Sequence, residues 1–476
     1  MKINKKWLYG IGIFIALLFV LNIGVNFWIK SKLPEIIRQK TNNSYEFTFN
    51  DLSFSFLGGR LSLEGISLSP KRFSENHFTA KIEKADISGI SFLKLLTKND
   101  IIVSSVKISN PDVSYYRIFK ENKDSIPSKT TSENSINIGK IKIENGKFKM
   151  FSEKKDTVLS VADFRLSVEN IKFSSETEAN KIPFNYEKVE FNISSFDYHP
   201  DKIYNLKSEN ISFVEKNLVI KNFGMLPKIS RKAFVKQLKT EKDLYTISAQ
   251  KISVNDLGFG SDKTDLFFRT PSVEFDSAKA NIFRSRIPAD DTTKKPLYSK
   301  LLRELPFFME IEKLYLKNSE IVYEEESIPN EPGKLTFSDF KAEISNINSG
   351  YKKTELPDVI ADIDCIFMHK SELKVKWNFN PMDKTEQFYI KGNMSNYNFQ
   401  KANSFLKPDM QISVEGDADK IAFNFSGNDI QGMGNFMINY NDLKITAYNK
   451  NLQKENHFVG IIANLLVKKS TNGKPK

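Results

Sequence analysis

The 476-residue sequence contains one cysteine and four histidines, and this scarcity excludes several classes of protein. A single cysteine, Cys365, excludes an intramolecular disulfide framework, a cysteine zinc cage and a CxxC redox pair. The histidines are scattered, and none has a second metal ligand at useful spacing. Cys365 and His369 are too far apart along a strand to form a thiolate–imidazole pair. We therefore expect a core cysteine and a surface histidine.

Catalytic motifs are also missing. The sequence has no HExxH, GxSxG, P-loop or dinucleotide fingerprint. Gly432-Met-Gly434 is too short to cradle a phosphate and indicates a bend in a strand. Glu324-Glu325-Glu326 follows a strand pattern and precedes a proline-containing stretch, so we expect a solvated turn there. These absences predict a protein that is not an enzyme and holds no cofactor or metal.

Charge of one sign is not concentrated anywhere. The 70 Lys+Arg exceed the 58 Asp+Glu and give a net charge of +12, but basic and acidic residues are intermixed along the chain. No RNP-type or recognition-helix pattern accompanies them, so we expect no nucleic-acid partner. The same positive surface is mildly attracted to membranes.

Apolar and aromatic residues are plentiful. Hydrophobic residues make up 40% of the chain and aromatic residues 12%, chiefly 39 Phe and 16 Tyr. A disordered chain does not carry such a content. The abundance of Phe and Tyr favours β-structure over helix.

One long apolar run lies near the N-terminus. The 23 residues from Trp7 to Ile29 carry no charge, and as a helix they would extend about 34 Å, enough for a hydrocarbon core of about 30 Å. Trp7, Tyr9 and Trp28 stand at its ends, where aromatic rings prefer the headgroup level. A cleavable signal peptide is the rival interpretation, but the run is long and no small-x-small cleavage site follows it. We expect an uncleaved, single-pass anchor.

The charges that flank this anchor do not set its orientation. Lys2, Lys5, Lys6 and the amino terminus lie on one side, and Lys30, Lys32, Arg38 and Lys40 on the other. Each side carries four positive groups, so the positive-inside rule does not predict which side faces the cytoplasm.

Short bursts of alternating apolar and polar residues follow from Tyr45 onward. Examples are Phe54-Ser-Phe56, Leu61-Ser-Leu63 and Ile141-Lys-Ile143. A period of two indicates strands with one buried and one wet face. Asn-Pro, Asn-Gly and similar pairs punctuate the bursts at hairpin-like spacing. Helical patterns are few, namely 297–305, 398–406 and an apolar C-terminal stripe from Phe458 to Val467.

Several of these bursts resemble one another. Residues 78–92 align without a gap on residues 245–259, and 61–70 resemble 218–227. Residues 138–150 match 311–323, with 103–115 as a weaker copy, and 162–171 return as 338–347. Matched turns at Asn110-Pro111, Asn145-Gly146 and Asn318-Ser319 strengthen the comparison. The chain therefore reuses one β module, and such modules stack side by side and build structures extended in one direction.

These patterns predict six segments. They are a tip and transmembrane anchor (1–30), a stalk helix (31–44), a first β block (45–215), a second β block (216–390), a C-terminal β block (391–450) and a C-terminal amphipathic helix with a basic tail (451–476).

The C-terminal β block carries a more specific signature. Residues 394–448 resemble the C-terminal block of AsmA-like proteins, in which a helical stretch precedes a strand with a glycine, a Phe-rich strand and a Tyr-x-Asp-Leu-Lys ending. The anchor and the strands over 45–70 resemble the start of that family. The chain departs from the family by lacking a second membrane helix and by having a short middle. The matching positions are Asn403, Pro408, Gly416, Gly427, Gly434, Tyr440, Asp442, Leu443 and Lys444.

The resemblance implies an inner-membrane protein of a diderm bacterium with its body in the periplasm. It also implies a long, twisted, mostly antiparallel β-groove of repeated modules with a few short helices, which holds or conducts phospholipid. On this interpretation the alternating residues place one apolar side in the groove. The side chains expected to line it are Leu61, Leu63, Ile141, Ile143, Phe148, Leu314, Leu316, Ile321, Phe423 and Phe425.

Two functions remain open at this stage. The first is the binding or transfer of phospholipid, or a similar acyl-chain lipid, between envelope membranes, because too few helices are present to cover an apolar sheet face. The second is a structural or assembly factor for outer-membrane biogenesis, whose sheet folds on itself into a dry sandwich and whose edges recruit envelope assembly proteins.

Overall fold

The computed structural model describes residues 29–448, with gaps at 36–37, 39–42, 56–57, 73–75, 92–93, 95–99, 118–134, 175–176, 178–179, 181, 183, 263–264 and 330. Residues 29–35 are helical, at the start of the predicted stalk. The expected anchor with Trp7, Tyr9 and Trp28 and the expected C-terminal helix lie outside the described residues. Within the described part, no helix is long and apolar enough to span a bilayer.

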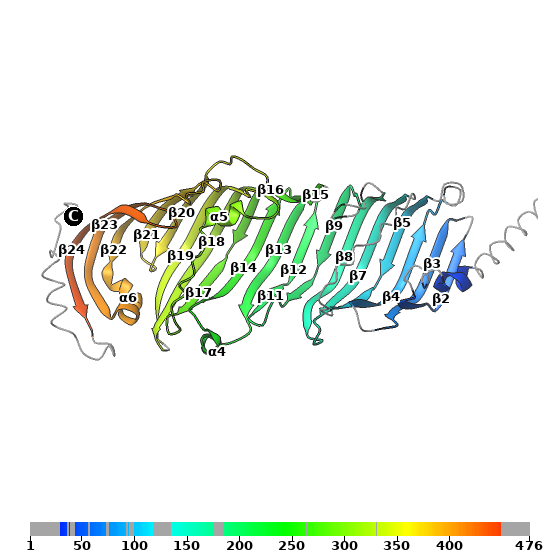
Figure 1. Cartoon of the computed structure of the whole chain (residues 1–476), viewed down its shortest axis with the longest axis horizontal. Helices are drawn as coiled ribbons and strands as arrows, with labels where there is room; N and C mark the ends of the chain where they lie inside the picture. The colour runs from blue at the N-terminus through cyan, green and yellow to red at the C-terminus, as the bar shows by residue number, and fades with distance from the viewer. Residues whose placement is uncertain are drawn as a thin grey trace, which may run out of the picture. The chain divides into compact units, whose positions relative to one another are not determined.

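The described chain is mainly β, as its composition predicted, and contains 24 strands (Figure 1). Its contacts divide into two compact units. Unit 1 comprises residues up to His199 together with Glu209–Glu215 and Ser261–Thr264, and unit 2 comprises the remainder. The expected block boundary at 215/216 is also a boundary between units, whereas the one expected at 390/391 falls inside strand β22 (Phe388–Asn398).

Unit 1 consists of antiparallel strands with one parallel step. Strands β1 and β2 both pair with β3, β3 pairs with β4, and β4 pairs with β5 and β6. Strands β5 and β6 run parallel to β7, which pairs with β8, and β8 pairs with β9 and β10. Strand β12 completes the unit beside β9. The bounds are β1 Tyr45–Thr48, β2 Asp51–Ser55, β3 Arg60–Pro70, β4 His77–Ser88, β5 Ile101–Ser109, β6 Asp112–Tyr116, β7 Ile136–Phe151, β8 Thr157–Phe173, β9 Lys188–Ile193, β10 Ser195–Tyr198 and β12 Asn210–Val214.

Unit 2 begins with the same plan and ends as a meander. Strand β11 pairs with β13, β13 with β14, and β14 with β16 and β17, which run parallel to β18. From β18 to β24 each strand pairs antiparallel with the next. The bounds are β11 Tyr204–Ser208, β13 Asn217–Pro227, β14 Asp243–Asn255, β15 Gly258–Asp262, β16 Asp265–Asp276, β17 Lys279–Ser285, β18 Phe308–Ile328, β19 Glu331–Asn348, β20 Val359–Phe367, β21 Ser371–Phe379, β22 Phe388–Asn398, β23 Ile412–Gly427 and β24 Gly432–Ala447.

The strand order of β3 to β8 therefore recurs in β13 to β19, with the parallel step at the same place. Left-handed backbone residues recur as well. Unit 1 has positive φ at Gly65, Asn145, Asp163 and Asn170, and unit 2 has it at the positions that the sequence repeat aligns with them, Asn222, Asn318, Asp339 and Asn346. Asn110 and Ser277 also have positive φ, and the strand registers place them in equivalent positions after β5 and β16. Glycine and asparagine tolerate this conformation best.

These left-handed residues correct one expectation. Asn145-Gly146 and Asn318-Ser319 were interpreted as hairpin turns, yet both lie inside long single strands, β7 and β18. The register shifts by one residue beside them, so they are bulges that bend a strand without reversing it. Apolar positions consequently change parity at each bulge, from Ile143 to Phe148 for example, and can stay on one face of the sheet.

The described helices are short. Helix α4 (Arg231–Gln237) follows β13, and α5 (Tyr298–Arg303) lies in the predicted 297–305 helix. The predicted 398–406 helix is a 3-10 turn, η1 (Phe399–Ala402), followed by α6 (Asn403–Met410).

Candidate functional site: an apolar face in each unit

Residues paired across neighbouring strands point to the same side of a sheet, so the registers show which side chains share a face. In unit 1 three successive rows on one face consist entirely of apolar residues. The first is Phe54, Leu61, Ile87, Val106, Ile141, Val168 and Val189; the second is Leu52, Leu63, Ala85, Ile108, Ile143, Leu166, Phe191 and Phe213; the third, beyond the bulges, is Phe47, Leu68, Ala80, Val113, Phe148, Val161 and Phe196.

Unit 2 has the same arrangement over more strands. Two rows run from β13 to β23, and a third lies beyond the bulges. The first is Leu218, Val254, Val273, Leu314, Ile344, Ala361, Trp377, Ile390 and Phe425; the second is Ile220, Ile252, Phe275, Leu316, Ala342, Ile363, Val375, Gly392 and Phe423; the third is Leu206, Met225, Ile247, Ala280, Ile321, Phe337 and Phe367.

The rows on either side of the bulges belong to one face. In unit 2, strand β20 runs without a bulge from Ala361 and Ile363 to Phe367, and these alternate residues belong to all three rows. In unit 1, Leu63 and Ile66 lie on either side of Gly65, whose φ is +61°, yet both pack in one hydrophobic cluster with Ile82 and Ala85.

The opposite face is polar. In unit 2 the alternate residues form a row of charged and other polar side chains. Ion pairs join neighbouring strands on this face, such as Lys376 with Asp362 (Nζ to Oδ1, 3.0 Å) and Lys313 with Glu343. In unit 1, Lys142 and Lys107 both pair with Glu144 at 2.7 and 2.9 Å. These bonds hold the pKa of Glu144 at about 2. One face of each sheet therefore suits water and the other does not. The members of the unit 2 row are Ser253, Glu274, Tyr315, Glu343, Asp362, Lys376, Lys391, Asn424 and Asn435.

All ten residues predicted to line the groove lie in these apolar rows. Leu63 is buried at 7% exposure and Phe425 is exposed at 39%, while the other eight are half-buried. The smaller neighbours, Val254 and Ala342 for example, are buried between larger side chains. A sheet face packed against a second layer would bury its large residues most, so the apolar faces are only partly covered by the described residues.

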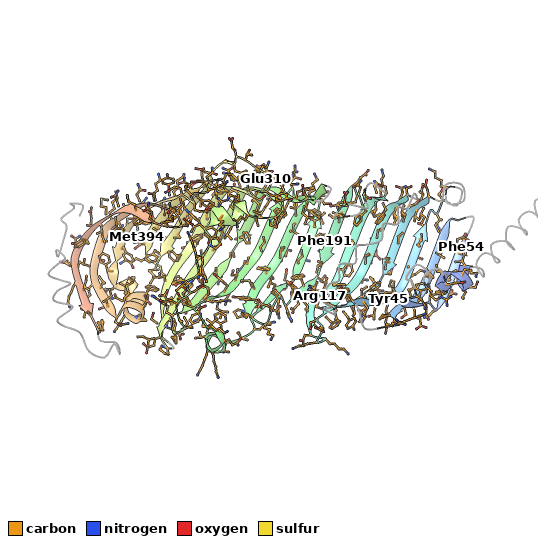
Figure 2. The ribbon with its side chains drawn as sticks, viewed as in Figure 1. Tyr45, Phe54, Arg117, Phe191, Glu310 and Met394 are labelled. Carbon is orange, nitrogen blue, oxygen red and sulfur yellow. The ribbon has the colours of Figure 1, made fainter. Side chains whose placement is uncertain are left out.

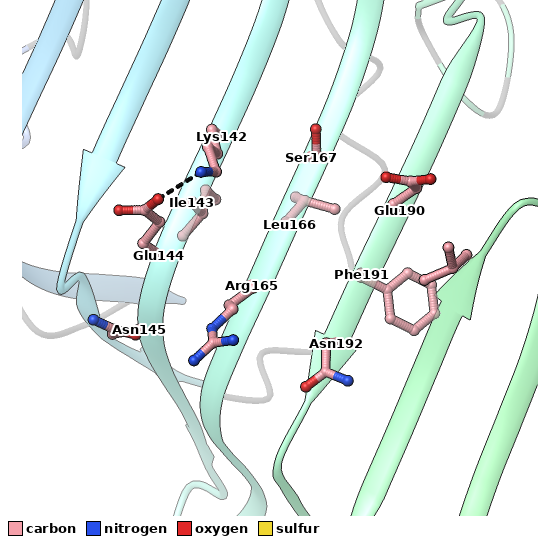
Figure 3. A pocket seen from close by; sticks show the side chains of 11 residues that line it. Lys142, Ile143, Glu144, Asn145, Arg165, Leu166, Ser167, Glu190, Phe191 and Asn192 are labelled. Atoms are coloured by element: carbon pink, nitrogen blue, oxygen red, sulfur yellow. Dashed lines mark ion pairs between the residues drawn. The ribbon is translucent and has the colours of Figure 1, made fainter.

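Two open hollows are lined mainly by residues of the opposite, polar face. In unit 1 a hollow of about 460 Å³ lies along β7, β8, β9 and β12, with Lys142, Arg165 and Glu190 among its residues (Figure 3). In unit 2 a hollow of about 790 Å³ is lined mainly by residues of β20 to β23 such as Asp362, Lys376 and Lys391. Neither hollow belongs to the apolar faces.

The connection from β17 to β18 crosses the apolar side of unit 2. This crossover segment, residues 286–307, must return along the sheet because β17 and β18 are parallel. Tyr298 of α5 makes an edge contact with Trp377 of the first apolar row, 5.3 Å between ring centroids. The segment therefore covers part of the apolar face.

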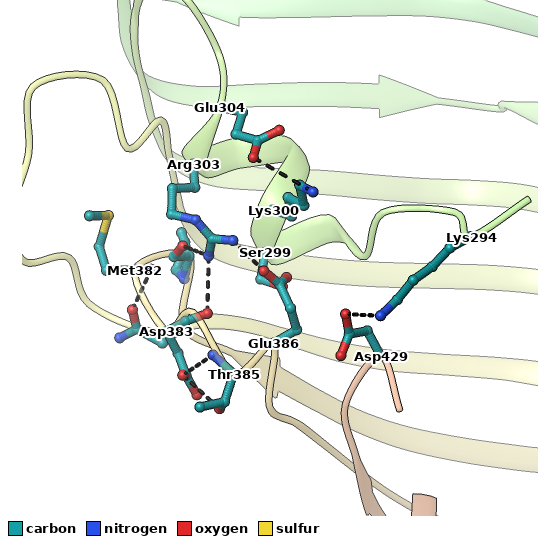
Figure 4. A network of polar contacts seen from close by, with 12 residues as sticks. Lys294, Ser299, Lys300, Arg303, Glu304, Met382, Asp383, Thr385, Glu386 and Asp429 are labelled. Atoms are coloured by element: carbon teal, nitrogen blue, oxygen red, sulfur yellow. Dashed lines mark hydrogen bonds and ion pairs between the residues drawn. The ribbon is translucent and has the colours of Figure 1, made fainter. Parts of the chain in front are cut away.

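A polar network fastens the crossover segment to the turns beyond it (Figure 4). Arg303 forms an ion pair with Glu386, and Ser299 donates a hydrogen bond to the same carboxylate. Arg303 also donates to the backbone oxygens of Pro381 and Asp383 at 2.9 and 3.0 Å. Only 16% of the Arg303 side chain and 6% of the Glu386 side chain are exposed. Sequence reasoning missed this network, because its members lie 87 and 83 residues apart.

Other helices cover the ends of the strands. Helix α6 and η1 lie on the apolar side, where Phe405 contacts Tyr323 and Phe399 packs in a cluster with Leu335. Helix α4 lies on the other side, where Phe234 packs with Leu244 and Phe283.

Candidate catalytic groups do not converge. Among the residues that the structure describes, no group of three or more His, Cys, Asp or Glu could hold a metal. Cys365 is buried in β20, and burial raises the pKa of its thiol to about 11, so the thiol is protonated at neutral pH. The expectation for Glu324-Glu325-Glu326 was wrong, because all three lie inside β18 and Glu325 is only 9% exposed. Ion pairs with Arg231 and Arg286 balance the charges of Glu324 and Glu325, so the strand can continue through these carboxylates.

No protein-family model matches this chain, and no curated protein matches it. The residues that carry the AsmA-like resemblance have structural roles in the last strands. Asn403 begins α6, and its side-chain amide exchanges two hydrogen bonds with the backbone of Val414. Gly416 has a φ of +109°, and a Cβ there would meet the backbone oxygens of Asn441 and Asp442 at 2.7 Å. These residues fix the geometry of the β23–β24 hairpin.

Proposed function

We propose that this chain binds acyl-chain lipid, phospholipid above all, on the apolar faces of its two units, and transfers it without catalysis. The observation that carries the proposal is the set of all-apolar rows, seven to nine residues long, most of whose larger members are half-buried. An apolar surface of this extent on a protein needs a partner to exclude water. Acyl chains supply that surface, while headgroups remain in water at the strand ends.

The dimensions of the rows suit this ligand. Residues lie about 3.3 Å apart along a strand, so the stretch from the first row to the third, from Leu314 to Ile321 for example, extends on the order of 20 Å. An acyl chain about 15 Å long, half of a hydrocarbon core of about 30 Å, therefore fits along the strands. Each apolar face is broad enough for several chains side by side.

The cellular setting belongs to the same proposal. The uncharged run from Trp7 to Ile29 anchors the chain in the inner membrane, and the β units lie in the periplasm, as the AsmA-like resemblance implies. Membership of that family and transfer between envelope membranes are parts of the proposal. The alternative is an assembly factor that carries no lipid.

Lipid retention tests the proposal. The full chain is purified from a bacterial host in a lipid-free detergent, and its co-purified lipids are extracted and counted. A variant with Leu316→Glu and Phe425→Glu places two charges on the apolar face of unit 2. The matched control, Ser345→Glu with Asn424→Glu, places two charges on the polar face of β19 and β23, opposite Lys313 and Lys391.

We expect the wild type and the control to retain several phospholipids per chain, and the apolar-face variant to lose at least half of them with unchanged circular dichroism. Equal lipid content in all three proteins would contradict the proposal, because annular lipid around the anchor would then account for it. A wild type free of lipid would favour the assembly factor.

A further inference from the structure

The apolar face of unit 2 changes character toward one end of β14, β17 and β18. The row Ile247, Ala280 and Ile321 is followed, two residues further along each strand, by Tyr245, Ile282 and Tyr323. The next row on the same face is Asp243, Arg284 and Glu325. Polarity therefore rises in steps from hydrocarbon to phenol to charge, in the order in which an amphiphile runs from its chain to its headgroup.

The tyrosines connect the apolar and charged rows. The Tyr245 hydroxyl donates a hydrogen bond to Oδ2 of Asp243 at 3.0 Å, and the Tyr323 hydroxyl donates to Glu325. Nε of Arg284 donates to Oδ1 of Asp243 at 2.6 Å. The side chains of Arg284 and Asp243 are 26% and 20% exposed, so the row is partly buried and still open to water.

Arg284 keeps part of its binding capacity. Only its Nε is engaged, and neither of its two terminal nitrogens bonds to a residue of the described chain. Those nitrogens form a planar fork that suits a phosphate. The half-exposed Arg286 lies 3.4 Å from Glu325 and adds a second positive charge.

The carboxylates set the class of headgroup. Asp243 and Glu325 balance Arg284 and Arg286, so these four groups together carry no net charge. A headgroup with phosphate alone would be repelled by the two carboxylates, whereas an ammonium group beside the phosphate would be attracted to them. A zwitterionic headgroup therefore matches the row.

The repeated strand plan supplies an independent observation. Phe78 pairs with Tyr115 as Tyr245, its counterpart in the repeat, pairs with Ile282. Arg117 therefore stands where Arg284 stands in unit 2, and Figure 2 shows it at the strand ends, away from Phe191. The positions aligned with Asp243 and Glu325 are Asn76 and Ser152. Both units thus keep the arginine, and only unit 2 adds the carboxylates.

We propose that Arg284, Asp243 and Glu325 form a headgroup site for a zwitterionic phospholipid with an ammonium group, whose phosphate pairs with Arg284 and whose ammonium pairs with Glu325. The acyl chains then continue past Tyr245 and Tyr323 onto the apolar rows. This inference rests on the proposed lipid binding and adds selectivity to it.

The test is a competition between headgroups. The full chain in detergent is incubated with vesicles of equal parts phosphatidylethanolamine and phosphatidylglycerol with identical acyl chains, repurified, and its retained lipids are quantified. We expect the wild type to retain phosphatidylethanolamine over phosphatidylglycerol by at least fivefold. The variant Arg284→Gln with Asp243→Asn removes both partners together and leaves no unpaired charge. Its ratio should fall to near one, with total lipid within twofold of the wild type.

Two further variants separate the site from general effects. Arg231→Gln with Glu324→Gln removes another arginine–carboxylate pair, on the opposite face of β18, and should keep the wild-type ratio. Arg284→Lys keeps the charge without the fork and should give an intermediate ratio. Soluble glycerophosphoethanolamine at millimolar concentration should not displace lipid, since a site for the free headgroup would need no acyl chain.

The outcomes distinguish this inference from the proposed function. Four outcomes would each overturn the headgroup site while leaving lipid binding intact. The first two are a lipid ratio near one in the wild type and an unchanged ratio in the Arg284→Gln and Asp243→Asn variant. The other two are an equal loss of selectivity in the Arg231→Gln and Glu324→Gln control and displacement of lipid by the soluble headgroup. If the wild type retains no more lipid than the Leu316→Glu and Phe425→Glu variant, both proposals fail.

Discussion

The ion pair and hydrogen bonds of Arg303 fasten the crossover segment to the turn that follows β21, and removing Arg303 should free the segment. Arg303→Met leaves the Glu386 carboxylate, 6% exposed, without its cation and leaves two backbone oxygens without their donor. Loss of one partner of a buried pair costs about 3–5 kcal/mol. Because Arg303 is 16% exposed, we take the lower end, about 3 kcal/mol.

Hydrogen exchange measures this loss locally. The amide of Leu301 bonds to the oxygen of Leu297, and the amide of Gly350 bonds to that of Leu302, so both report the seating of α5. A loss of about 3 kcal/mol corresponds to roughly 100-fold faster exchange. We expect that change at residues 297–305 and 350 and at the 380–387 turn, with little change in β13 and β14.

The matched control is Lys300→Ala, which breaks an exposed i,i+4 pair with Glu304 on the same helix. Such a pair contributes less than about 1 kcal/mol, so exchange should rise by no more than a few fold. Unchanged exchange in Arg303→Met, or an equal rise throughout unit 2, would refute the fastening role of this network.

Three further predictions follow from individual side chains. Gly416→Ala should lower the melting temperature, because a Cβ at a φ of +109° meets two backbone oxygens at a cost of about 1–3 kcal/mol. The control is Gly432→Ala, whose Cβ would have no heavy atom nearer than 3.9 Å. Equal melting temperatures of the two variants would contradict the hairpin geometry. Cys365 should stay unreactive toward a thiol reagent at pH 8 until the protein unfolds, since burial raises its pKa to about 11; rapid labelling of the native protein would contradict its burial. Tyr245 should keep its proton at pH 11, because burial and Asp243 raise its pKa to about 12. The contribution of Tyr245 to stability is therefore present below pH 10 and is lost as the pH rises toward 12. The difference in absorbance at 295 nm between the wild type and Tyr245→Phe measures this ionisation, and ionisation near pH 10 would contradict the prediction.

The sequence predicted the β architecture well because the period of two is a local signal. Leu61 with Leu63 and Phe423 with Phe425 alternate with polar residues, and each pair lies on one face of one strand. The repeat was also visible from sequence, and the strand order of β3 to β8 and of β13 to β19 now explains it. Asn145 and Asn318 were misjudged because asparagine with positive φ serves bulges as well as turns, and residue types alone do not separate the two.

Other features depend on contacts that are distant in sequence. The crossover segment is polar and aperiodic over 290–296, and the helical pattern over 297–305 did not show which surface the helix would pack on. Glu325 was expected in a solvated turn because the cations that pair with its strand, Arg231 and Arg286, come from other elements. The charged row at the end of unit 2 was not predicted either, because the strand registers, and not the repeats seen in the sequence, place Arg117 and Arg284 in equivalent positions.

The most direct test of the central claim is to ask which side chains contact an acyl chain. A phospholipid with a photoreactive diazirine near the middle of one acyl chain is bound to the full chain, irradiated, and its attachment sites are mapped by mass spectrometry. Lipid binding on the apolar faces predicts labelling with a period of two along β18 and β23, at Leu314, Leu316, Phe423 and Phe425 and not at Tyr315 or Asn424. Labelling of adjacent residues without alternation, or labelling confined to residues 1–30, would contradict it.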